Sequence, residues 1–281
     1  MVCKEEVELR ELIVWNPSTD EQHRVPMPPS YCEQPFFAWN AALLCAAPGC
    51  DHLDCPPGRP FLVVFLCCLH HQQTTTMDMS ALVYSSEQGA WRDPISLHHV
   101  HGPRRCGLRP RAPNALVSNT STNNAAIYFA CHTKIGILEY DFAKQRLSII
   151  SLPPLGIRLT HNFLLMTAQD GGLGFAYGTA DSKLCLWSRP PGGGGNWAQQ
   201  TVIELGNKVA HHLQAVYAVA IADEAGLIFI WVGNKQLFTV DLRSSRVHKI
   251  ADDVLLDSGI VPYTNFYTPA ALLGRAASIY R

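Results

Sequence analysis

Short runs of β-branched and aromatic residues alternate with polar turns along the whole chain. Five pairs of such runs form hairpins, each with a turn rich in Asp, Asn, Ser, Gly or Pro. The predicted hairpins occupy residues 12–26, 80–91, 135–150, 183–203 and 236–250. Their turns begin at Asn16, Ser85, Asp141, Ser188 and Asp241, roughly 45 to 70 residues apart. The chain therefore repeats one β-hairpin unit.

Further strand candidates precede these hairpins, at residues 61–66, 125–130, 163–167, 173–177, 217–222 and 227–232. Units of about 40 to 50 residues with four strands each are typical of propeller blades. The continuous apolar run 227–232 indicates a strand buried on both faces, as stacked blades require. The sequence predicts an all-β, β-propeller-like (kelch-like) array of four-stranded blades with about five recognisable units. Whether that array is complete stays open.

Two segments fit this pattern less clearly. The Ala-rich segment 36–46 has a weak helical signal, but Pro35 and Pro48 bracket it closely, so we expect a strand or a short turn of helix. The segment 98–113 holds four arginines and three prolines, and we expect it to be an irregular connector.

Composition and charge indicate which classes of partner and which compartment to expect. Of the 281 residues, 47% are hydrophobic and 16% charged, and the formal net charge is -1. This balance gives no electrostatic reason to expect nucleic acid or an anionic membrane as a partner. The start of the chain has no apolar signal region, and the longest apolar run, 61–69, is too short for a membrane-spanning helix. We expect a soluble protein of the cytoplasm or nucleus, with its ten cysteines reduced.

The most metal-like cluster consists of Cys45, Cys50, His52 and Cys55. Structural zinc takes four such ligands, but here all four would come from one short stretch without a second CxxC pair, so a tight loop is the preferred interpretation. The histidine groups are 70–71, 98–101 and 211–212. Neighbouring strand residues point to opposite faces, and no carboxylate lies nearby in sequence to orient these rings, so we expect loop histidines.

No catalytic motif stands out. Cys131 and His132 are adjacent in sequence, whereas a catalytic pair meets through the fold. The acidic residues fall mostly at turns, and the glycine-rich segment 171–174 precedes a strand, which favours a β-turn over a phosphate loop. We expect no catalytic, cofactor-binding or metal-binding residue, and no enzyme. Four tryptophans beside the hairpin turns either pack between blades or line a recognition surface: Trp15, Trp91, Trp187 and Trp197.

The segment 14–19, Val-Trp-Asn-Pro-Ser-Thr, followed by the Pro-Met-Pro-Pro of 26–29, resembles the signature of plant F-box-associated domains. Further landmarks of a grass F-box subfamily are similar to segments 50–55, 83–86, 138–141, 152–154 and 266–270. The resemblance implies substrate recognition in a Skp–cullin–F-box ubiquitin ligase, in which F-box helices bind the Skp-type adaptor and the C-terminal domain holds a target protein.

The resemblance does not extend to the F-box, because too few residues precede Val14 for the F-box helices. We expect a short N-terminal segment without an F-box (1–11), a propeller domain (12–270) and a C-terminal tail (271–281). Adaptor and cullin would bind only a form that carries the F-box. The alternatives are an F-box-less decoy, or a truncated fragment, that binds targets without ubiquitination, and a propeller hydrolase, which would need two convergent carboxylates.

Overall fold

The computed structural model describes most of the strand-forming parts of the chain. The described residues are 11–16, 20–29, 38–46, 59–70, 76–101, 115–118, 126–131, 135–154, 163–190, 195–209, 215–223, 225–233, 235–255, 260–262 and 277–278. Nearly all regular structure in them is β-strand, and one short helix, α2 (Gly206–Val209), is present. None of the helical structure in these ranges is long and apolar enough to cross a membrane.

Four sheets of four or five antiparallel strands form the body of the protein. The first contains β3 (Ala38–Cys45), β4 (Phe61–His70), β5 (Thr76–Ser85), β6 (Ala90–Trp91) and β7 (Ile95–His101), with both β6 and β7 paired to β5. The second contains β8 (Ala115–Ser118), β9 (Ala126–Ala130), β10 (Ile137–Asp141) and β11 (Arg146–Ile150). The third contains β12 (Leu164–Thr167), β13 (Leu173–Gly178), β14 (Lys183–Arg189) and β15 (Ala198–Glu204). The fourth contains β16 (Val216–Ala222), β17 (Leu227–Val232), β18 (Gln236–Asp241) and β19 (Val247–Ala251).

Two smaller sheets come from the two ends of the described chain. The strands β1 (Glu11–Asn16) and β2 (Glu21–Pro26) form one antiparallel pair, and β20 (Val261–Pro262) and β21 (Ala277–Ser278) form the other. Within each larger sheet the strands pair in sequence order and form a meander, except that β7 pairs with β5 and not with β6.

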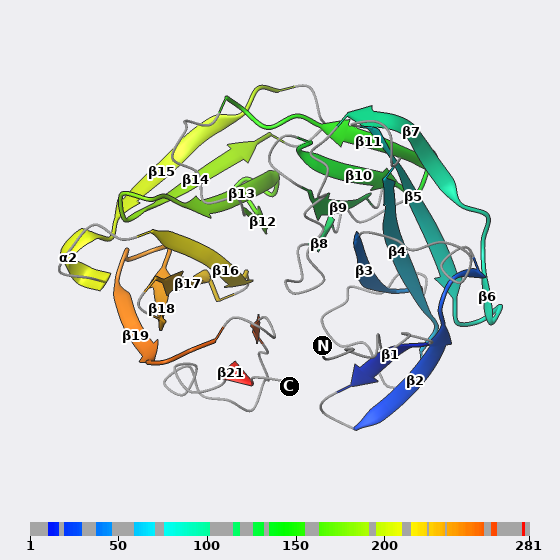
Figure 1. Ribbon diagram of the computed structural model, residues 1–281, viewed down its shortest axis with the longest axis horizontal. Coiled ribbons are helices and arrows are strands. Elements are labelled where there is room, and N and C mark those ends of the chain that lie inside the picture. Colours follow the sequence, from blue (N-terminus) through cyan, green and yellow to red (C-terminus); the bar gives the residue numbers. More distant parts are fainter. Residues whose placement is uncertain are drawn as a thin grey trace, which may run out of the picture.

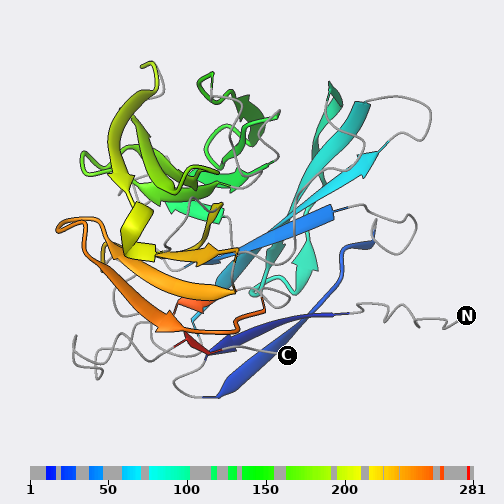
Figure 2. The ribbon, with the colours of Figure 1, turned by 60° about the vertical axis from the view of Figure 1, so that its left-hand side comes forward.

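The sheets follow one another around a common centre, with the first strand of each innermost (Figure 1). Successive inner strands contact one another: β3 with β8, β8 with β12, β12 with β16, and β16 with β20. Figure 2 shows the sheets edge-on, with the strands of each sheet fanning out by twist. This arrangement of radial, meandering sheets is a β-propeller, so the predicted fold class is confirmed.

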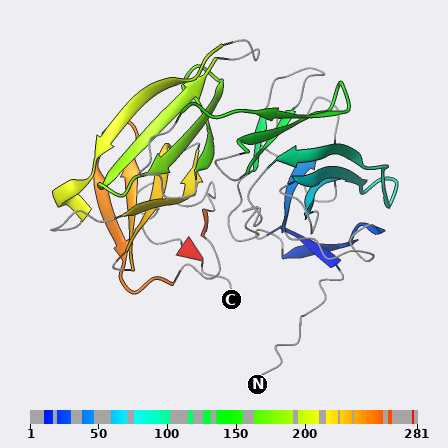
Figure 3. The same cartoon turned by 45° about the horizontal axis from the view of Figure 1, so that its top comes forward.

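Apolar side chains fill the space between neighbouring blades. Between the first and second sheets, Met79 packs in one cluster with Phe129 and Tyr140. The third and fourth sheets share another, in which Leu186 and Ile230 take part. Figure 3 shows these two sheet pairs lying side by side. The core is therefore divided among blade interfaces.

The sequence predicted the strands well. All five predicted hairpins are present, as β1–β2, β5–β6, β10–β11, β14–β15 and β18–β19, and all six further candidates are strands. The Ala-rich segment 36–46 contains β3, so the strand alternative is correct. The expectation of an irregular connector was wrong for residues 98–101, which belong to β7. That strand pairs with β5 through its backbone, and as an outer strand it does not need an apolar pattern.

A glycine permits the close approach of the third and fourth blades. A Cβ at Gly178, the last residue of β13, would lie 2.1 Å from the carbonyl oxygen of Val216, the first residue of β16. Real Cβ atoms do not come this close to backbone, and neither strand can move without opening the blade interface.

We therefore expect Gly178→Ala to lower the free energy of unfolding by about 1–3 kcal/mol, because the added methyl group overpacks the interface. Chemical denaturation of the two proteins measures this difference. Gly233→Ala is the matched control, since a Cβ there meets no atom within 4 Å. A loss of stability equal to that of the control would contradict the close contact.

Tryptophan side chains also connect neighbouring blades. The indole Nε1–H of Trp91, in β6, donates a hydrogen bond of 2.8 Å to the carbonyl oxygen of Pro26, at the end of β2. The same relation recurs two blades later, where the Nε1–H of Trp197 donates to the carbonyl of Ser151, immediately after β11 (2.8 Å). An indole near the start of one outer strand is thus bonded to the end of the preceding outer strand.

Replacing Trp91 with Phe keeps an aromatic ring but removes the donor, and it should cost about 0.5–1.5 kcal/mol of unfolding free energy. The measurement is urea denaturation followed by circular dichroism. Trp15→Phe serves for comparison, because the Trp15 indole bonds Asp20 within its own hairpin turn (2.9 Å) and is partly exposed. Equal losses for the two variants would show that the contact between blades adds nothing.

Candidate recognition surface

The turns of the blades emerge at two opposite ends. In a meander, the turns between strands one and two and between strands three and four lie at one end, and the remaining turns at the other. We call the first end the hairpin face; its described turn residues are 86–89, 142–145, 168–172, 223, 225–226 and 242–246. The other end, the connector face, holds the described turn residues 179–182, 233 and 235 and the segment 205–209 that leaves β15.

Four of the five outer hairpins share the spacing between a short polar residue and a residue with positive φ. Each turn begins at a residue with a short polar side chain and contains a residue with positive φ four positions later. The pairs are Asn16 with Asp20, Ser85 with Gly89, Asp141 with Gln145, and Asp241 with Ser245. Short polar residues at such positions accept hydrogen bonds from the backbone that follows them, and Gly and Asp tolerate positive φ better than β-branched residues.

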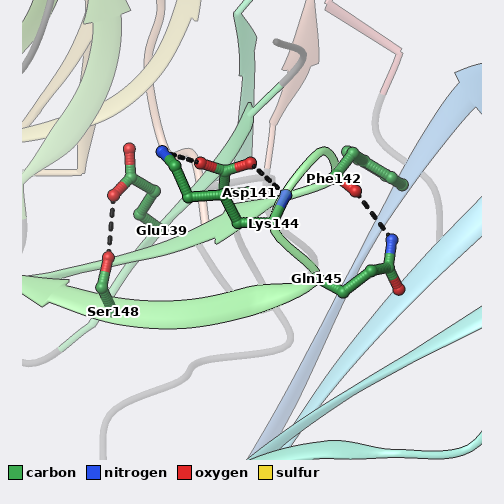
Figure 4. A network of polar contacts seen from close by, with 6 residues as sticks. All are labelled: Glu139, Asp141, Phe142, Lys144, Gln145 and Ser148. Atoms are coloured by element: carbon green, nitrogen blue, oxygen red, sulfur yellow. Dashed lines mark hydrogen bonds and ion pairs between the residues drawn. The ribbon is translucent and has the colours of Figure 1, made fainter. Parts of the chain in front are cut away.

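The β10–β11 turn shows how tightly such a turn is held (Figure 4). Asp141 Oδ1 accepts a hydrogen bond from the backbone N–H of Lys144 at 2.9 Å, while Oδ2 accepts one from Lys144 Nζ at 2.7 Å. The Nε2–H of Gln145 donates to the carbonyl oxygen of Phe142 at 2.8 Å. The turn is therefore closed by its own side chains.

A second group of contacts lies beside this turn on the same sheet. Ser148 Oγ donates to Glu139 Oε2 at 2.8 Å across the β10–β11 pair (Figure 4). Burial, together with the adjacent Glu139 carboxylate, raises the pKa of Tyr128 to about 12. Tyr128 thus stays a neutral phenol at physiological pH, positioned against the third blade with Phe175.

Hydrogen bonds at the hairpin face also set the charge state of its aspartates. The Lys144 side chain, followed by the Lys144 backbone N–H, lowers the pKa of Asp141. The backbone N–H groups of Ser244 and Arg243 lower the pKa of Asp241, which accepts both hydrogen bonds on Oδ1 at 2.9 and 2.8 Å. Both carboxylates are therefore ionised and act as turn anchors.

Asp141→Asn should lower the free energy of unfolding at pH 7 by about 0.2–1 kcal/mol, because Asn keeps the turn acceptor but loses the exposed ion pair. A carboxyl group with a lowered folded-state pKa stabilises the fold above its ordinary pKa, near 3.8, and that contribution disappears as pH falls through the folded-state value. Urea denaturation at pH 7, 5 and 3 measures the difference in unfolding free energy between wild type and Asp141→Asn.

The difference in stability between the two proteins should therefore shrink progressively as pH falls below about 4. Glu87→Gln, which removes an exposed carboxylate from the β5–β6 turn, controls for general charge effects. A difference between wild type and Asp141→Asn that is constant with pH would contradict an electrostatic role for Asp141.

Two inner turns complete the hairpin face. In the β12–β13 turn, Asp170 Oδ1 accepts from Gly172 N at 2.9 Å. In the β16–β17 turn, Asp223 Oδ2 accepts from the backbone N–H of Thr167, at the end of β12 in the neighbouring blade, at 2.9 Å. Exposed side chains stand at the tips of these fixed turns, among them Gln88, Lys144, Gln169 and Arg243.

At the connector face the described turn of the third blade is covered. Ser182 is fully buried, and Thr179 is 8% exposed. The backbone N–H of Leu205 donates to the carbonyl of Ser182, and that of Val216 donates to the carbonyl of Thr179. The chain that leaves β15 therefore packs over this turn, whereas the hairpin-face tips remain accessible.

The sequence-predicted metal cluster lies mostly outside the described residues. Cys45 is a half-buried residue of β3, whereas Cys50, His52 and Cys55 lie outside those ranges. His71, His132, His211 and His212 also lie outside them. Within the described ranges, no three His, Cys, Asp or Glu side chains form a group that could hold a metal ion.

The structure does place a carboxylate beside one predicted histidine group. Asp78, in β5, contacts His98 in β7, with 3.2 Å between Oδ2 and Nδ1, and its Oδ1 accepts from the backbone N–H of His99 at 2.9 Å. His99 has a φ of 56° and lies where the β5–β7 register shifts. The sequence argument missed this contact because Asp78 lies twenty residues away on the paired strand.

The cysteines and the glycine segment behave as packing and turn residues. Burial raises the pKa of the Cys67 thiol to about 12, and burial also raises the pKa of Cys185. Cys131 is buried after β9, and its thiol donates to the carbonyl of Phe129 at 3.8 Å. Gly171 has a φ of 76° in the β12–β13 turn, so residues 171–172 form a turn, as predicted.

The fold and these turns define a β-propeller with an ordered and accessible hairpin face. Within that class, the chain belongs to the family described as F-box protein AT5G49610-like, beta-propeller, whose model matches residues 14–270. The resemblance seen in the sequence is therefore confirmed at the level of an F-box-protein-like propeller. No curated protein sequence matches the chain.

Two solved structures illustrate more distant likenesses. The periplasmic gluconolactonase PpgL of Pseudomonas aeruginosa is 13% identical, with a TM-score of 0.38 over 68% of this chain and 54% of that one. An arginine-to-alanine mutant of AofleA from Arthrobotrys oligospora is 14% identical, with a TM-score of 0.41 over 85% of this chain and 64% of that one. The chain spans less than two thirds of the length of either protein, and neither likeness bears on activity.

Proposed function

We propose that this propeller is a protein-interaction domain that receives target proteins for a Skp–cullin–F-box ubiquitin ligase. The observation that carries the proposal is the family match over residues 14–270, nearly the whole chain. An F-box protein joins a ligase to its substrate, and its propeller is the part available to hold that substrate. The adaptor and cullin would contact an F-box segment, and the ubiquitin transfer would be performed by other subunits.

The chemistry of the described residues supports binding over catalysis. Asp141 and Asp241 are committed to turns, and the shifted pKa values of Cys67 and Cys185 keep these thiols protonated. A nucleophilic cysteine needs the opposite shift. These residues build and fix the scaffold, and we propose that the protein is not an enzyme.

We further propose that the target binds at the hairpin face. Its turns are rigid, because side chains anchor them, and they present polar side chains from several blades at one end of the ring. A surface that is already ordered loses little conformational entropy on binding. A partner that contacts several such turns would be a folded protein or an extended peptide, in the cytoplasm or nucleus.

The test is quantitative capture from plant-cell extract with the tagged chain as bait. The double variant Gln88→Arg with Gln169→Arg adds bulk and charge at two hairpin-face tips and should reduce target capture at least about tenfold. The matched control is Gln199→Arg with Gln200→Arg, the same change at exposed positions of the outer strand β15. The control should capture the target as wild type does.

The outcomes of this experiment discriminate between the alternatives. A discrete partner lost only with the hairpin-face variant supports the proposal. If the partner is ubiquitinated when the bait is fused to an F-box, the ligase role is supported; if not, a decoy is favoured. Equal capture by both double variants would contradict the proposal that the target binds at the hairpin face. Recovery of adaptor and cullin by this chain without a fused F-box would contradict the proposal that they contact an F-box segment.

A further inference from the structure

Four outer turns of the hairpin face share one spacing but differ in charge. In each, the residue five positions after the short polar anchor lies opposite that anchor across the hairpin. This position holds, in chain order, Glu21, Ala90, Arg146 and Arg246. The four side chains therefore occupy equivalent places in their blades, and the charge at that place changes from acidic through neutral to basic.

The whole turns follow the same trend around the ring. The turn 16–21 holds two acidic residues and no basic one, and the turn 85–90 holds one acidic residue and no basic one. The turns 141–146 and 241–246 each hold two basic residues and one acidic residue. These turns belong to β1–β2 and to the first, second and fourth large blades, which follow one another around the ring in that order (Figure 1). The outer rim of the hairpin face thus has an acidic half and a basic half.

The carboxylates in the basic half are engaged by hydrogen bonds of the scaffold. Asp241 accepts two backbone N–H groups of its own turn, and Asp141 accepts the backbone N–H and the ammonium group of Lys144. In the inner turns, Asp170 and Asp223 each accept a backbone N–H at 2.9 Å. These acidic side chains are therefore bound within or between turns.

Three arginines of the basic half, by contrast, are exposed: Arg146, Arg243 and Arg246. None of them forms an ion pair with an acidic side chain in the described ranges. Arg243 extends over the inner turn of its own blade, where a Cβ at Gly226 would lie 3.8 Å from its Nε. The backbone N–H of Leu242 donates to the carbonyl of Gly226 at 2.9 Å and holds the two turns together. Because a guanidinium group is permanently charged and matches a carboxylate in shape, these side chains are suited to bind acidic residues.

We propose that the target of the hairpin face binds through an acidic segment, whose Asp and Glu carboxylates pair with Arg146, Arg243 and Arg246. The inference rests on the proposed function, since it names the chemistry of the protein that the propeller receives. Exposed ion pairs are individually weak, so several of them act together, while the acidic half of the rim repels the same segment and fixes its direction. Gln88 lies beside Glu87 in the acidic half, so the effect expected of an arginine there concerns a different part of the face.

A peptide-binding measurement tests the site without any extract. The probe is a fluorescein-labelled peptide of alternating Glu and Ser, about twelve residues and about 40 Å long when extended. Fluorescence anisotropy at about 0.15 M ionic strength measures its affinity for the purified chain. Wild type should bind it at least about tenfold more tightly than the same peptide with Gln in place of Glu.

The variant that combines Arg146→Gln, Arg243→Gln and Arg246→Gln should lose about tenfold in affinity for the Glu peptide, because all three proposed ion pairs are removed. Lys at the same three positions keeps the charge and should lose less, since only the shape of the guanidinium group is missing. Circular dichroism melts establish that the variants are folded.

The matched control combines Lys183→Gln, Lys235→Gln and Lys249→Gln, which removes the same charge from β14, the β17–β18 turn and β19. It should bind the Glu peptide as wild type does. Equal affinity of wild type for the Glu and Gln peptides would overturn the proposal. Equal losses in the arginine and lysine triple variants would also overturn it, because the attraction would then reflect net charge alone.

Capture from plant-cell extract connects this site to the target. The Glu peptide in excess, and not the Gln peptide, should displace the captured partner from the wild-type bait, and the arginine triple variant should capture at least about fivefold less of it. A discrete partner captured equally by wild type and this variant would overturn the acidic segment and leave the proposed function intact. Arginine-dependent binding of the Glu peptide without any discrete partner in the extract would instead support the carboxylate site and contradict the proposed function.

Discussion

Both faces of the inner strands must be buried at once, and the whole architecture follows from this requirement. All six residues of β13 are buried, so its sheet needs an apolar neighbour on each side. A single sheet or a sandwich with one open face would leave half of this surface in water, whereas a ring of blades covers both sides of every inner strand. The close approach of Gly178 to Val216 shows how tightly that condition is met.

The outer hairpins obey a different constraint. Their outermost strands, such as β15, expose most of their residues, so polar residues are tolerated there, and the turns are closed by side chains such as Asp141 and Asp241. Tryptophan indoles then tie successive outer strands together over long sequence separations. The rim is rigid although it is polar, and this combination suits a surface that presents side chains to another protein.

Membership of an F-box-protein-like propeller family gives this surface a biological context. A receptor of the kind proposed above would hold its target in a fixed orientation, and side-chain hydrogen bonds within the turns of the hairpin face fix their shape. The same polar turns that stabilise the blades locally are the ones available for contact.

The sequence by itself determined the hairpins, because turn chemistry is local: Asp141 bonds Lys144 only three residues away, and β-branched runs flank the turn. It could not determine contacts between distant strands, such as Trp91 with Pro26, 65 residues apart, or Asp78 with His98. It missed β7, since an outer strand pairs through its backbone and needs no apolar pattern. Which turns share a face, and which strand lies innermost, was decided only by tertiary structure, because both depend on how the sheets pack around one centre.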